Sequence, residues 1–337
     1  MKDLLKVDIS LIKELSILIE QAQNKVVSYA NSSLTFLFWQ VGKRINDEIL
    51  NNDRAEYGKQ IISTVSIQLV ARFGRNFEEK NLRRMIQFAQ VYPSSEIVVS
   101  LSRQLTWSHI LVLLPLKSDD ARLFYAQLIE SEHLSVRELR KQIETKTFER
   151  VKIANIQVNK SELLPINTFK DPYIFDFLGL KNDYLEKDLE FAVLRELEMF
   201  ILEMGKGFSF VERQKRMIID GEDFYLDLLF FHRKLRRLVA VELKLGKFKA
   251  QDKGQMELYL NWLNKYERQE FEEAPIGLIL CAENSKEQVE LLKMHKDGIM
   301  VAEYWTELPP KAELEQKLHN ALIEAKMRFE NNLIEYE

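Results

Sequence analysis

The sequence contains little cysteine, and this scarcity narrows the class of protein. Cys281 is the single cysteine among 337 residues, so a framework of disulfides within the chain is excluded. No apolar run approaches the roughly 18 residues that a membrane-spanning helix requires. The charged N-terminus, MKDLLKVD, lacks the apolar core of a signal peptide. We therefore expect a cytoplasmic protein with no membrane partner.

Glycine and proline are also scarce, with 11 and 7 residues, whereas 46% of all residues are hydrophobic. This composition excludes disordered and fibrous classes and allows sizeable cores. The chain is longer than one core usually supports, so we expect two domains. The net charge is −4, yet basic residues outnumber acidic ones between residues 205 and 256. Such a basic region suits nucleic acid as a partner, and a solvated basic surface is the alternative.

The first half of the chain shows helical periodicity almost throughout. Apolar residues at helical spacing predict one long helix over residues 10–49. GKQIISTVSIQLVARFG and NFEEKNLRRMIQFAQVYP predict two more helices, and Asn76 with Glu79 has capping-box spacing at the start of the second. This pair fits a helix-turn-helix whose second member meets DNA, with an ordinary helical hairpin as an equal alternative. The basic residues that would contact DNA are Lys80, Arg83 and Arg84.

Further helices are expected up to about residue 150, one of them with a capping box at Ser135 and Glu138. The helical pattern then weakens as far as Pro172, which indicates a domain junction. After Pro309 and Pro310 a last helix carries one apolar stripe that packs on its own chain or, as the alternative, on a second copy. We expect a helical domain over 1–150, a linker over 151–172, a second domain over 173–308 and a C-terminal helix over 309–337.

The second half changes to a mixture of helices and strands. LEKDLEFAVLRELEMFILEMG predicts one helix that ends at Gly205. Three β-rich runs follow, FSFVERQKRMII, DFYLDLLFF and LVAVELKL, and the basic turn HRKLRR joins the last two into an antiparallel hairpin. A helix over 252–268, the strand PIGLILCAE, the helix SKEQVELLKMH and the strand GIMVAEY complete the order. We therefore predict an α/β fold with a mixed sheet flanked by helices, preceded by an all-α N-terminal domain.

Three charged residues interrupt the two paired strands. Glu242 and Lys244 lie two apart in VAVELKLGKF, so their side chains project from the same face of the strand. An unpartnered charge in such an apolar run costs several kcal/mol, which favours a built site over the alternative of a charge pair on an edge strand. Asp227 lies in the middle of FYLDLLFF, and pairing across the turn brings it to the same end of the sheet as Glu242.

Two convergent carboxylates and one backbone carbonyl, here that of Leu243, suit Mg²⁺, which prefers oxygen ligands in near-octahedral geometry and retains several waters. Lys244 would then orient the attacking water and stabilise negative charge that develops at phosphorus. This chemistry hydrolyses a phosphodiester. Glu190 and Glu196 both border the apolar stripe of the preceding helix, and their spacing does not decide which one is a further metal or water contact.

Other chemistries find no support in the sequence. GKGFSF lacks the loop and the Ser/Thr of a phosphate-binding P-loop. The histidines lack the spacing of a zinc site, and Cys281 in LILCAE is typical of a core position. Ser108 and His109 are neighbours in the chain, an arrangement that rarely presents a nucleophile to its base. A serine hydrolase is therefore disfavoured.

The second half resembles the PD-(D/E)xK nuclease superfamily. The resemblance is carried by Asp227, by the triplet Glu242-Leu243-Lys244, and by Gln255 with Tyr259, whose Gln-x-x-x-Tyr spacing is seen in the RecB-like branch. More narrowly, a helical N-terminal half with NLRRM, TWSH and RELRKQI, followed by DFYLDLLFFHRKLRRLVAVELKLGKF and GQMELYLN, is similar to the YhcG-like nucleases of prokaryotes over nearly the whole chain. No proline precedes Asp227, where the name of the superfamily places one, but many members lack it.

The resemblance implies a restriction-endonuclease-like αβββαβ core and an endonuclease that acts on DNA with Mg²⁺, for which Mn²⁺ can substitute, in genome defence or mobile-element processing. The site residues it implies are Asp227, Glu242, the carbonyl of Leu243 and Glu190 at the metal, Lys244 as the catalytic lysine, and Gln255 with Tyr259 as a positioning pair. The basic residues that would hold phosphates are Arg213, Lys215, Arg216, Arg233, Lys234, Arg236, Arg237, Lys247, Lys249 and Lys253. The alternative is a catalytically inactive nucleic-acid-binding or assembly module, partnered by a second copy or by a protein of a defence system.

Overall fold

The structure is a computed structural model that describes residues 9–50, 55–158, 163–164, 166–178, 180, 186–205, 207–283 and 286–334. The N-terminal MKDLLKVD, residues 51–54 and, within the expected linker, residues 159–162 and 165 lie outside these ranges. The chain forms two compact units, Met1–Lys141 and Gln142–Glu337. Among the described residues no helix is long and apolar enough to cross a membrane.

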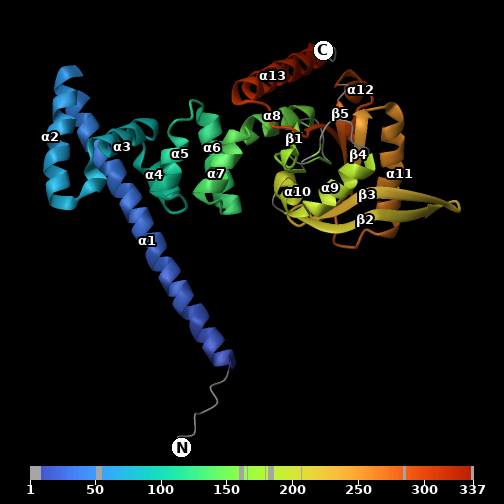
Figure 1. The fold of residues 1–337 in the computed structure, drawn as a ribbon, viewed down its shortest axis with the longest axis horizontal. Coiled ribbons are helices and arrows are strands. Elements are labelled where there is room, and N and C mark those ends of the chain that lie inside the picture. The colour runs from blue at the N-terminus through green and yellow to red at the C-terminus, as the bar shows by residue number, and fades with distance from the viewer. Residues whose placement is uncertain are drawn as a thin grey trace, which may run out of the picture. The chain divides into compact units, whose positions relative to one another are not determined.

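The first unit is built from helices, as the sequence predicts (Figure 1). Their bounds are α1 Ile9–Leu50, α2 Ala55–Phe73, α3 Glu79–Val91, α4 Ser95–Ser102, α5 Trp107–Leu113, α6 Asp119–Glu132 and α7 Val136–Glu144. The core of this unit is formed by Phe38, Ile45, Ile62, Leu82, Met85 and Ile86. Helix α1 crosses α3 so closely at Gly42 that an added Cβ would lie 1.9 Å from the carbonyl oxygen of Met85. Glycine at this position therefore permits the crossing.

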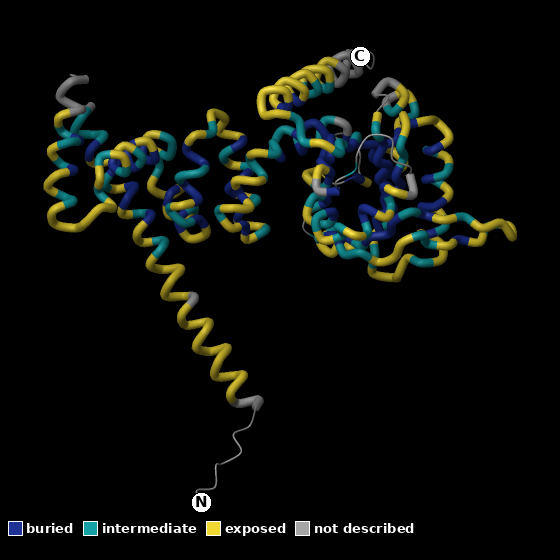
Figure 2. The backbone as a smooth tube through the Cα atoms, in the orientation of Figure 1, coloured by how far each residue is buried: buried dark blue, intermediate teal, exposed yellow. Residues whose placement is uncertain are grey.

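Helix α1 extends well beyond the helices against which it packs. Its residues 12–23 and 25–30 are all exposed, and buried positions begin only at Thr35 (Figure 2). The apolar periodicity that predicts the helix therefore continues past the part that contributes to the core. Only the C-terminal half of α1 stabilises the first unit through burial.

One predicted helix cap is formed and another is not. The Ser135 backbone N–H donates to Glu138 at 2.7 Å and the Glu138 N–H donates to the Ser135 hydroxyl at 3.3 Å, which confirms that capping box. The box predicted at Asn76 and Glu79 is wrong, because a 3₁₀ helix over Arg75–Phe77 takes up Asn76 and Glu78 becomes the N-cap of α3 without a side-chain bond. Because Asn76 is part of the 3₁₀ helix, it cannot be the N-cap of α3, and the cap position moves to Glu78.

A mixed six-stranded sheet forms the centre of the second unit, in the order β1-β6-β5-β4-β3-β2. The strands are β1 Tyr173–Ile174, β2 Phe208–Ile219, β3 Glu222–His232, β4 Arg237–Lys247, β5 Ile276–Glu283 and β6 Ile299–Trp305. β2, β3 and β4 pair antiparallel, whereas β4, β5, β6 and β1 pair parallel. The predicted hairpin across HRKLRR and the mixed α/β class are confirmed. The two-residue β1 was not expected.

Helices cover both faces of this sheet (Figure 1). Their bounds are α8 Thr147–Val158, α9 Glu186–Arg195, α10 Leu197–Met204, α11 Ala250–Tyr266, α12 Lys286–Leu291 and α13 Lys311–Ile334. On β4, Val239, Val241 and Leu243 belong to one core with α9 and α10. Ala240 belongs to the other core, with α11. The alternation of a strand thus assigns successive residues of β4 to opposite layers.

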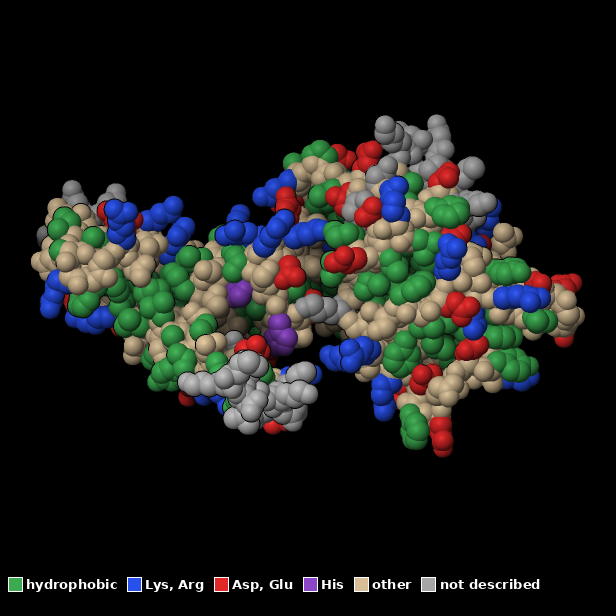
Figure 3. Space-filling model, turned by 60° about the horizontal axis from the view of Figure 1, so that its bottom comes forward, with side chains coloured by type: hydrophobic (Ala, Val, Ile, Leu, Met, Phe, Trp, Pro, Cys, Tyr) green, Lys and Arg blue, Asp and Glu red, His purple; other side chains and the backbone are tan. Residues whose placement is uncertain are grey.

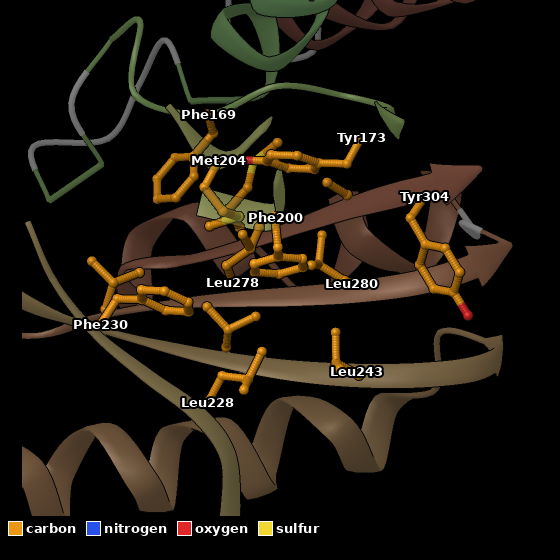
Figure 4. Packing of buried hydrophobic residues seen from close by; sticks show 14 of the residues in the cluster. Phe169, Tyr173, Phe200, Met204, Leu228, Phe230, Leu243, Leu278, Leu280 and Tyr304 are labelled. Carbon is orange, nitrogen blue, oxygen red and sulfur yellow. The ribbon is translucent and has the colours of Figure 1, made fainter. Parts of the chain in front are cut away.

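The core on the α9 and α10 face is rich in aromatic side chains. Phe200 of α10 stacks on Phe230 of β3 with ring centroids 6.0 Å apart, and Phe175 stacks on Tyr304 of β6 at 5.6 Å. Figure 4 shows Phe169, Tyr173 and Met204 above the same strands. This packing holds the sheet rigid on one face, and polar residues project from the opposite face.

Two expectations about the second unit need correction. The single helix expected before Gly205 is divided into α9 and α10 at Glu196, which leaves helical geometry with φ −107° and ψ 31°. On either side of the break, α9 and α10 both bury residues in the same core. Residues 151–172 are not a free linker, because α8 continues to Val158 and buried Ala154, Leu164 and Phe169 join that core.

The C-terminal helix α13 packs on its own chain, as favoured. Leu314 and Leu318 bury against Ile153 of α8, and Lys146 pairs with Glu315 at 2.7 Å. Gly205 follows α10 with φ 120°, which confirms its place at the helix end.

Candidate active site

The acidic residues lie where two paired strands part. Pairing between β3 and β4 runs from His232 opposite Arg237 to Leu228 opposite Val241 and then stops. The next residue on each strand is an acid, Asp227 on β3 and Glu242 on β4. Beyond this point β3 continues its pairing with β2 alone. The hairpin predicted from the sequence therefore brings the two acids to one level of the sheet.

Asp227 is held by three hydrogen bonds from three directions. Its backbone N–H donates to Oε1 of Glu242 at 3.4 Å. Its Oδ2 accepts the backbone N–H of Leu243 at 2.8 Å, and its Oδ1 accepts Nε2 of Gln214 at 3.1 Å. The carboxylate of β3 is thereby tied to both neighbouring strands.

Glu242 and Lys244 share a strand face and form an ion pair. Nζ of Lys244 lies 3.0 Å from Oε2 of Glu242. Glu242 is 3% exposed, whereas 23% of the Lys244 side chain reaches solvent. Glu242 is buried and Lys244 lies between it and solvent. This arrangement suits a site that substrate enters from solvent, on the side where Lys244 is exposed.

Burial dominates the protonation of both acids. Burial and, to a smaller extent, the charge of Asp227 raise the pKa of Glu242 to about 8, against the opposing effect of Lys244. Burial also raises the pKa of Asp227, although the N–H of Leu243 and the charge of Lys244 oppose that change. The protein therefore supplies less positive charge than two ionised carboxylates need.

A chain of hydrogen bonds connects Lys244 to helix α11. Nζ of Lys244 donates to Oε1 of Gln255 at 3.5 Å, and Nε2 of Gln255 lies 2.7 Å from the Tyr259 hydroxyl. That hydroxyl donates to the carbonyl of Tyr225 on β3 at 3.1 Å. Burial raises the pKa of Tyr259, so its hydroxyl keeps the proton that it donates. The Gln-x-x-x-Tyr pair thus lies against the lysine.

The donor set fits a hydrated divalent cation. Asp227 and Glu242 provide carboxylate oxygens, the carbonyl of Leu243 lies between Glu242 and Lys244 in the chain, and the Lys244 ammonium lies beside the two acids. Hard cations such as Mg²⁺ take oxygen ligands and keep several waters. Within the described part of the chain no group of three or more Asp, Glu, His or Cys side chains could hold a metal ion. Any cation here would rely on two carboxylates.

Among the described residues, no hydrogen bond or ion pair joins either candidate for a third acid, Glu190 or Glu196, to Asp227 or Glu242. Glu190 lies on α9, whose Leu189 and Val193 pack in the core on the sheet face opposite Glu242. Glu196 pairs with Arg195 at 3.2 Å. The periodicity of the helix identified its buried side but not which face of the sheet that side would cover.

Of the ten basic residues of the second unit expected near phosphates, four form ion pairs with acidic side chains and a fifth donates to a backbone carbonyl. Lys215, Arg216, Arg236 and Lys253 form ion pairs, and Arg237 donates to the carbonyl of Leu163 at 2.8 Å. Over the second unit, Figure 3 accordingly shows Lys and Arg side chains interspersed with Asp and Glu. The exposed basic residues for which the described structure shows no ion pair are Arg213, Arg233, Lys234, Lys247 and Lys249.

These exposed residues lie at different ends of the β3–β4 hairpin. Arg233 and Lys234 are in its turn, whereas Lys247 and Lys249 follow the site lysine. In the first unit, Lys80 and Arg83 are exposed on α3, Arg83 pairs with Glu79 at 2.5 Å, and Arg84 donates to Asn81 at 3.4 Å.

Two residues of the site escaped the sequence reasoning, Gln214 and Tyr225. A signal was present, because Asp220 and Gly221 form the kind of two-residue turn that joins β-hairpins. Counting back from Ile219 opposite Glu222 in that hairpin reaches Gln214 at the level of Asp227.

Comparison with family models matches most of the chain. Residues 166–319 match a family model described as the YhcG PDDEXK nuclease domain. Residues 14–150 match a model described as the DUF1016 N-terminal domain. The two matches together include every element that carries the site.

Individual proteins are also similar to this chain. A protein named putative nuclease YhcG from Escherichia coli (strain K12) is 35% identical over 340 residues, which cover 89% of this chain and 91% of the relative. A solved repair endonuclease from Pyrococcus abyssi is 25% identical, with a TM-score of 0.26 over 39% of this chain and 50% of that one. A structure of an EndoMS-dsDNA2 complex is 16% identical, with a TM-score of 0.27 over the same shares.

Proposed function

The chain belongs to the YhcG family of PDDEXK nucleases, and we propose that this hydrolytic nuclease is an endonuclease that cleaves DNA with Mg²⁺ bound by Asp227 and Glu242. PDDEXK nucleases generally use divalent metal ions. The observation that carries the proposal is the hydrogen bond of 3.4 Å from the Asp227 N–H to Glu242, beside the Lys244 ion pair of 3.0 Å. A buried Glu242, a half-buried Asp227 and one lysine at the end of paired strands fit phosphodiester hydrolysis better than a structural role.

Each residue of the site has a distinct part in the reaction. A cation held by Asp227, Glu242 and the Leu243 carbonyl would polarise the phosphate and lower the pKa of a bound water. Lys244 would donate to the attacking water or to a non-bridging oxygen, because its ammonium is a donor-only group and 23% of the side chain reaches solvent. The oxygen of the attacking water would bond to phosphorus and lose a proton to solvent, the bond from phosphorus to the leaving oxygen would break, and that oxygen would take up a proton from solvent.

Gln255 and Tyr259 would hold Lys244 in place rather than react. The amide of Gln255 accepts from Nζ and the Tyr259 hydroxyl anchors that amide to the carbonyl of Tyr225. A lysine with four rotatable bonds loses orientation without such partners. This pair therefore contributes to rate through the position of the ammonium.

The exposed basic residues suggest how far DNA would extend. Arg233 lies just beyond the end of β3, six residues after Asp227 and about 20 Å from it. Phosphates along one strand of a duplex are about 3.4 Å apart along the axis, so a duplex that reaches from Asp227 to Arg233 would span roughly six base pairs. Phosphate contacts of this kind give affinity without reading sequence.

Cleavage of supercoiled plasmid with and without Mg²⁺ tests the proposal. The wild type should cut with Mg²⁺ or Mn²⁺ and stop on chelation, and Lys244→Ala should lose at least ~100-fold in rate, as for removal of one transition-state donor. Lys311→Ala, which removes an exposed lysine at the start of α13, is the matched control and should cut normally. Equal cutting by the wild type and Lys244→Ala would end the proposal.

The same assay separates further alternatives. Nicked circles would indicate single sites acting alone, and linear product would indicate two chains acting together. RNA and single-stranded DNA in parallel reactions would reveal a different substrate. Binding that survives chelation without any cut product would favour an inactive binding or assembly module.

A place in genome defence or mobile-element processing follows from the family and is part of the proposal. Cells carrying the wild type should resist phage or incoming plasmids better than cells carrying Lys244→Ala. Equal plating efficiency of phage and equal plasmid uptake in both would remove this role and leave the nuclease chemistry standing.

A further inference from the structure

Gln214 has an unusual backbone for a residue in the interior of a strand. It lies within β2, Phe208–Ile219, yet its φ is 46°. A residue with a side chain adopts this left-handed region at a cost in free energy, and only where the surroundings enforce it. Such strain is common at functional sites, so the neighbour that enforces it is informative.

The residue at the same level on β3 is Asp227. Arg213 pairs with Leu228 and Lys215 pairs with Leu226, which leaves Gln214 and Asp227 facing each other between these pairs. β3 is irregular at the same level. Leu226 belongs to the core with α11, whereas Leu228 belongs to the core with α9.

Residues two apart in a regular strand share a face, so a reversal between Leu226 and Leu228 requires a local distortion at Asp227. Distortions of this kind redirect a side chain, and they occur often beside active sites. Here both strands depart from regular geometry at the same step. Gln214 and Asp227 thus form one irregular pair rather than two separate ones.

The irregular pair determines how the Asp227 carboxylate is oriented. Nε2 of Gln214 donates to Oδ1 at 3.1 Å while the N–H of Leu243 donates to Oδ2 at 2.8 Å. Each carboxylate oxygen accepts about two hydrogen bonds or ligands, so these two donors do not use the full capacity of the carboxylate. The donor from β2 is neutral, and it therefore orients the acid without competing for its charge as a lysine or arginine would.

We propose that Gln214 is a positioning residue that fixes the Asp227 carboxylate for the cation, and that its left-handed backbone serves to aim the amide. The inference rests on the proposed function, in which Asp227 binds that cation. It adds a third strand to the site, because β2 would contribute alongside β3 and β4. The side-chain amide donates to Asp227, whereas the strain is in the backbone. A substitution can therefore remove the amide and leave the strained backbone in place.

Binding of Mg²⁺ and Mn²⁺, measured by calorimetry on the full chain, tests the proposal. Gln214→Leu keeps the bulk of the side chain but removes the donor, and it should weaken metal affinity about tenfold or more, as expected for loss of a hydrogen bond to a charged group. Gln214→Gly relieves the strain and also removes the amide, and it should weaken the affinity equally. The matched control is Asp220→Gly in the same hairpin, where φ is 50°. That control relieves similar strain away from the site and should leave the affinity unchanged.

The thermal midpoint of each variant shows that it is folded. Wild-type affinity in both Gln214→Leu and Gln214→Gly would overturn the positioning role and leave the proposed function intact. If Asp227→Asn binds the metal as tightly as the wild type does, both the positioning role of Gln214 and the proposed function are overturned. A requirement for higher Mg²⁺ in cleavage, with an unchanged rate at saturation, is the kinetic signature expected of the Gln214 variants.

Discussion

The backbone N–H of Asp227 on β3 donates to the side chain of Glu242 on β4 across 3.4 Å, so the two acids of the site are linked before any cation is considered. This contact draws Glu242 inward, where it is 3% exposed. A second carboxylate held beside the first raises the free energy of ionising either one. The site therefore favours a proton or a cation as a third partner.

The first prediction is that protons compete with Mg²⁺ for the site. Burial raises the pKa of Glu242 to about 8, so near neutral pH a binding cation must displace its proton. Affinity for Mg²⁺ should rise as pH increases through about 8 and then level off. Calorimetry in two buffers of different ionisation enthalpy should reveal the released proton. Equal affinities at pH 6.5 and pH 9, with no proton released, would contradict this account.

The second prediction concerns Glu242→Gln and stability after treatment with a chelator. Because the folded pKa of Glu242 lies above its ordinary 4.5, the folded state holds more protons than the unfolded state between that value and about 8. Stability from this group is full below 4.5 and is lost as pH rises to about 8. Glutamine cannot ionise, so the advantage of Glu242→Gln in thermal midpoint over wild type should grow across this range.

A glutamate on the surface provides the control for the comparison of thermal midpoints. Glu270→Gln makes the same chemical change at an exposed position and should track the wild type at every pH. If the difference in thermal midpoint between Glu242→Gln and wild type stays constant from pH 5 to pH 9, Glu242 does not have the raised pKa on which this prediction depends. Loss of Mg²⁺ binding is expected in Glu242→Gln but not in Glu270→Gln.

The third prediction concerns the hydroxyl of Tyr259. Tyr259→Phe keeps the ring but leaves the carbonyl of Tyr225 and the amide of Gln255 without their partner. Loss of such a hydrogen bond costs about 1 kcal/mol of stability, and a less ordered Lys244 should reduce the turnover rate roughly tenfold. Tyr266→Phe on the same helix, at a tyrosine that is 60% exposed, should change neither quantity. Equal rates for the two variants would exclude a role for α11 in orienting the lysine.

The fourth prediction addresses a buried polar network remote from the acids. Arg150 is fully buried and pairs with Glu203, which also accepts from Lys170 and from the N–H of Ile174 at 3.0 Å. Glu203→Gln leaves Arg150 without its counter-charge and should destabilise the second unit by about 3–5 kcal/mol. Chemical denaturation measures this loss. Glu198→Gln, exposed on the same helix, should fall within experimental error of wild type.

The same network has a pH dependence of opposite sign to that of Glu242. Burial alone would raise the pKa of Glu203, but the charges of Arg150 and Lys170 hold it below its ordinary value. The stability contributed by this acid is therefore present above 4.5 and is lost as pH falls through the lower folded value. Acid unfolding should consequently begin at higher pH when Lys170 is changed to Met.

Local patterns in the sequence predicted much of the fold and the centre of the site. Strand alternation placed Glu242 with Lys244, the basic turn placed Asp227 beside them, and helical spacing placed Gln255 with Tyr259. Each of these relations lies within one element or one hairpin. Such relations depend on local geometry that propensity and periodicity describe well.

The features that escaped prediction depend on tertiary packing. The break at Glu196 and the burial of Leu164 and Phe169 follow from the shape of a core that no single segment reveals. The irregular step at Gln214 violates the alternation on which the strand was recognised. Glu190 lies on the expected helix, but the sheet face covered by that helix is set by the whole layer order. Sequence reasoning fails here because local preferences give way to the assembled fold.

The contacts at the site form a closed ring. From Asp227 they pass to Glu242, Lys244, Gln255 and Tyr259 and return to β3 at the carbonyl of Tyr225, two residues before the start. The members are separated by as many as 34 positions in the chain, so the ring cannot close on a ribosome until α11 has emerged and docked. An unfinished or partly unfolded polypeptide would carry the acids and the lysine without their mutual alignment. Destructive chemistry would then arise only in a completed domain, which protects the cell that synthesises it.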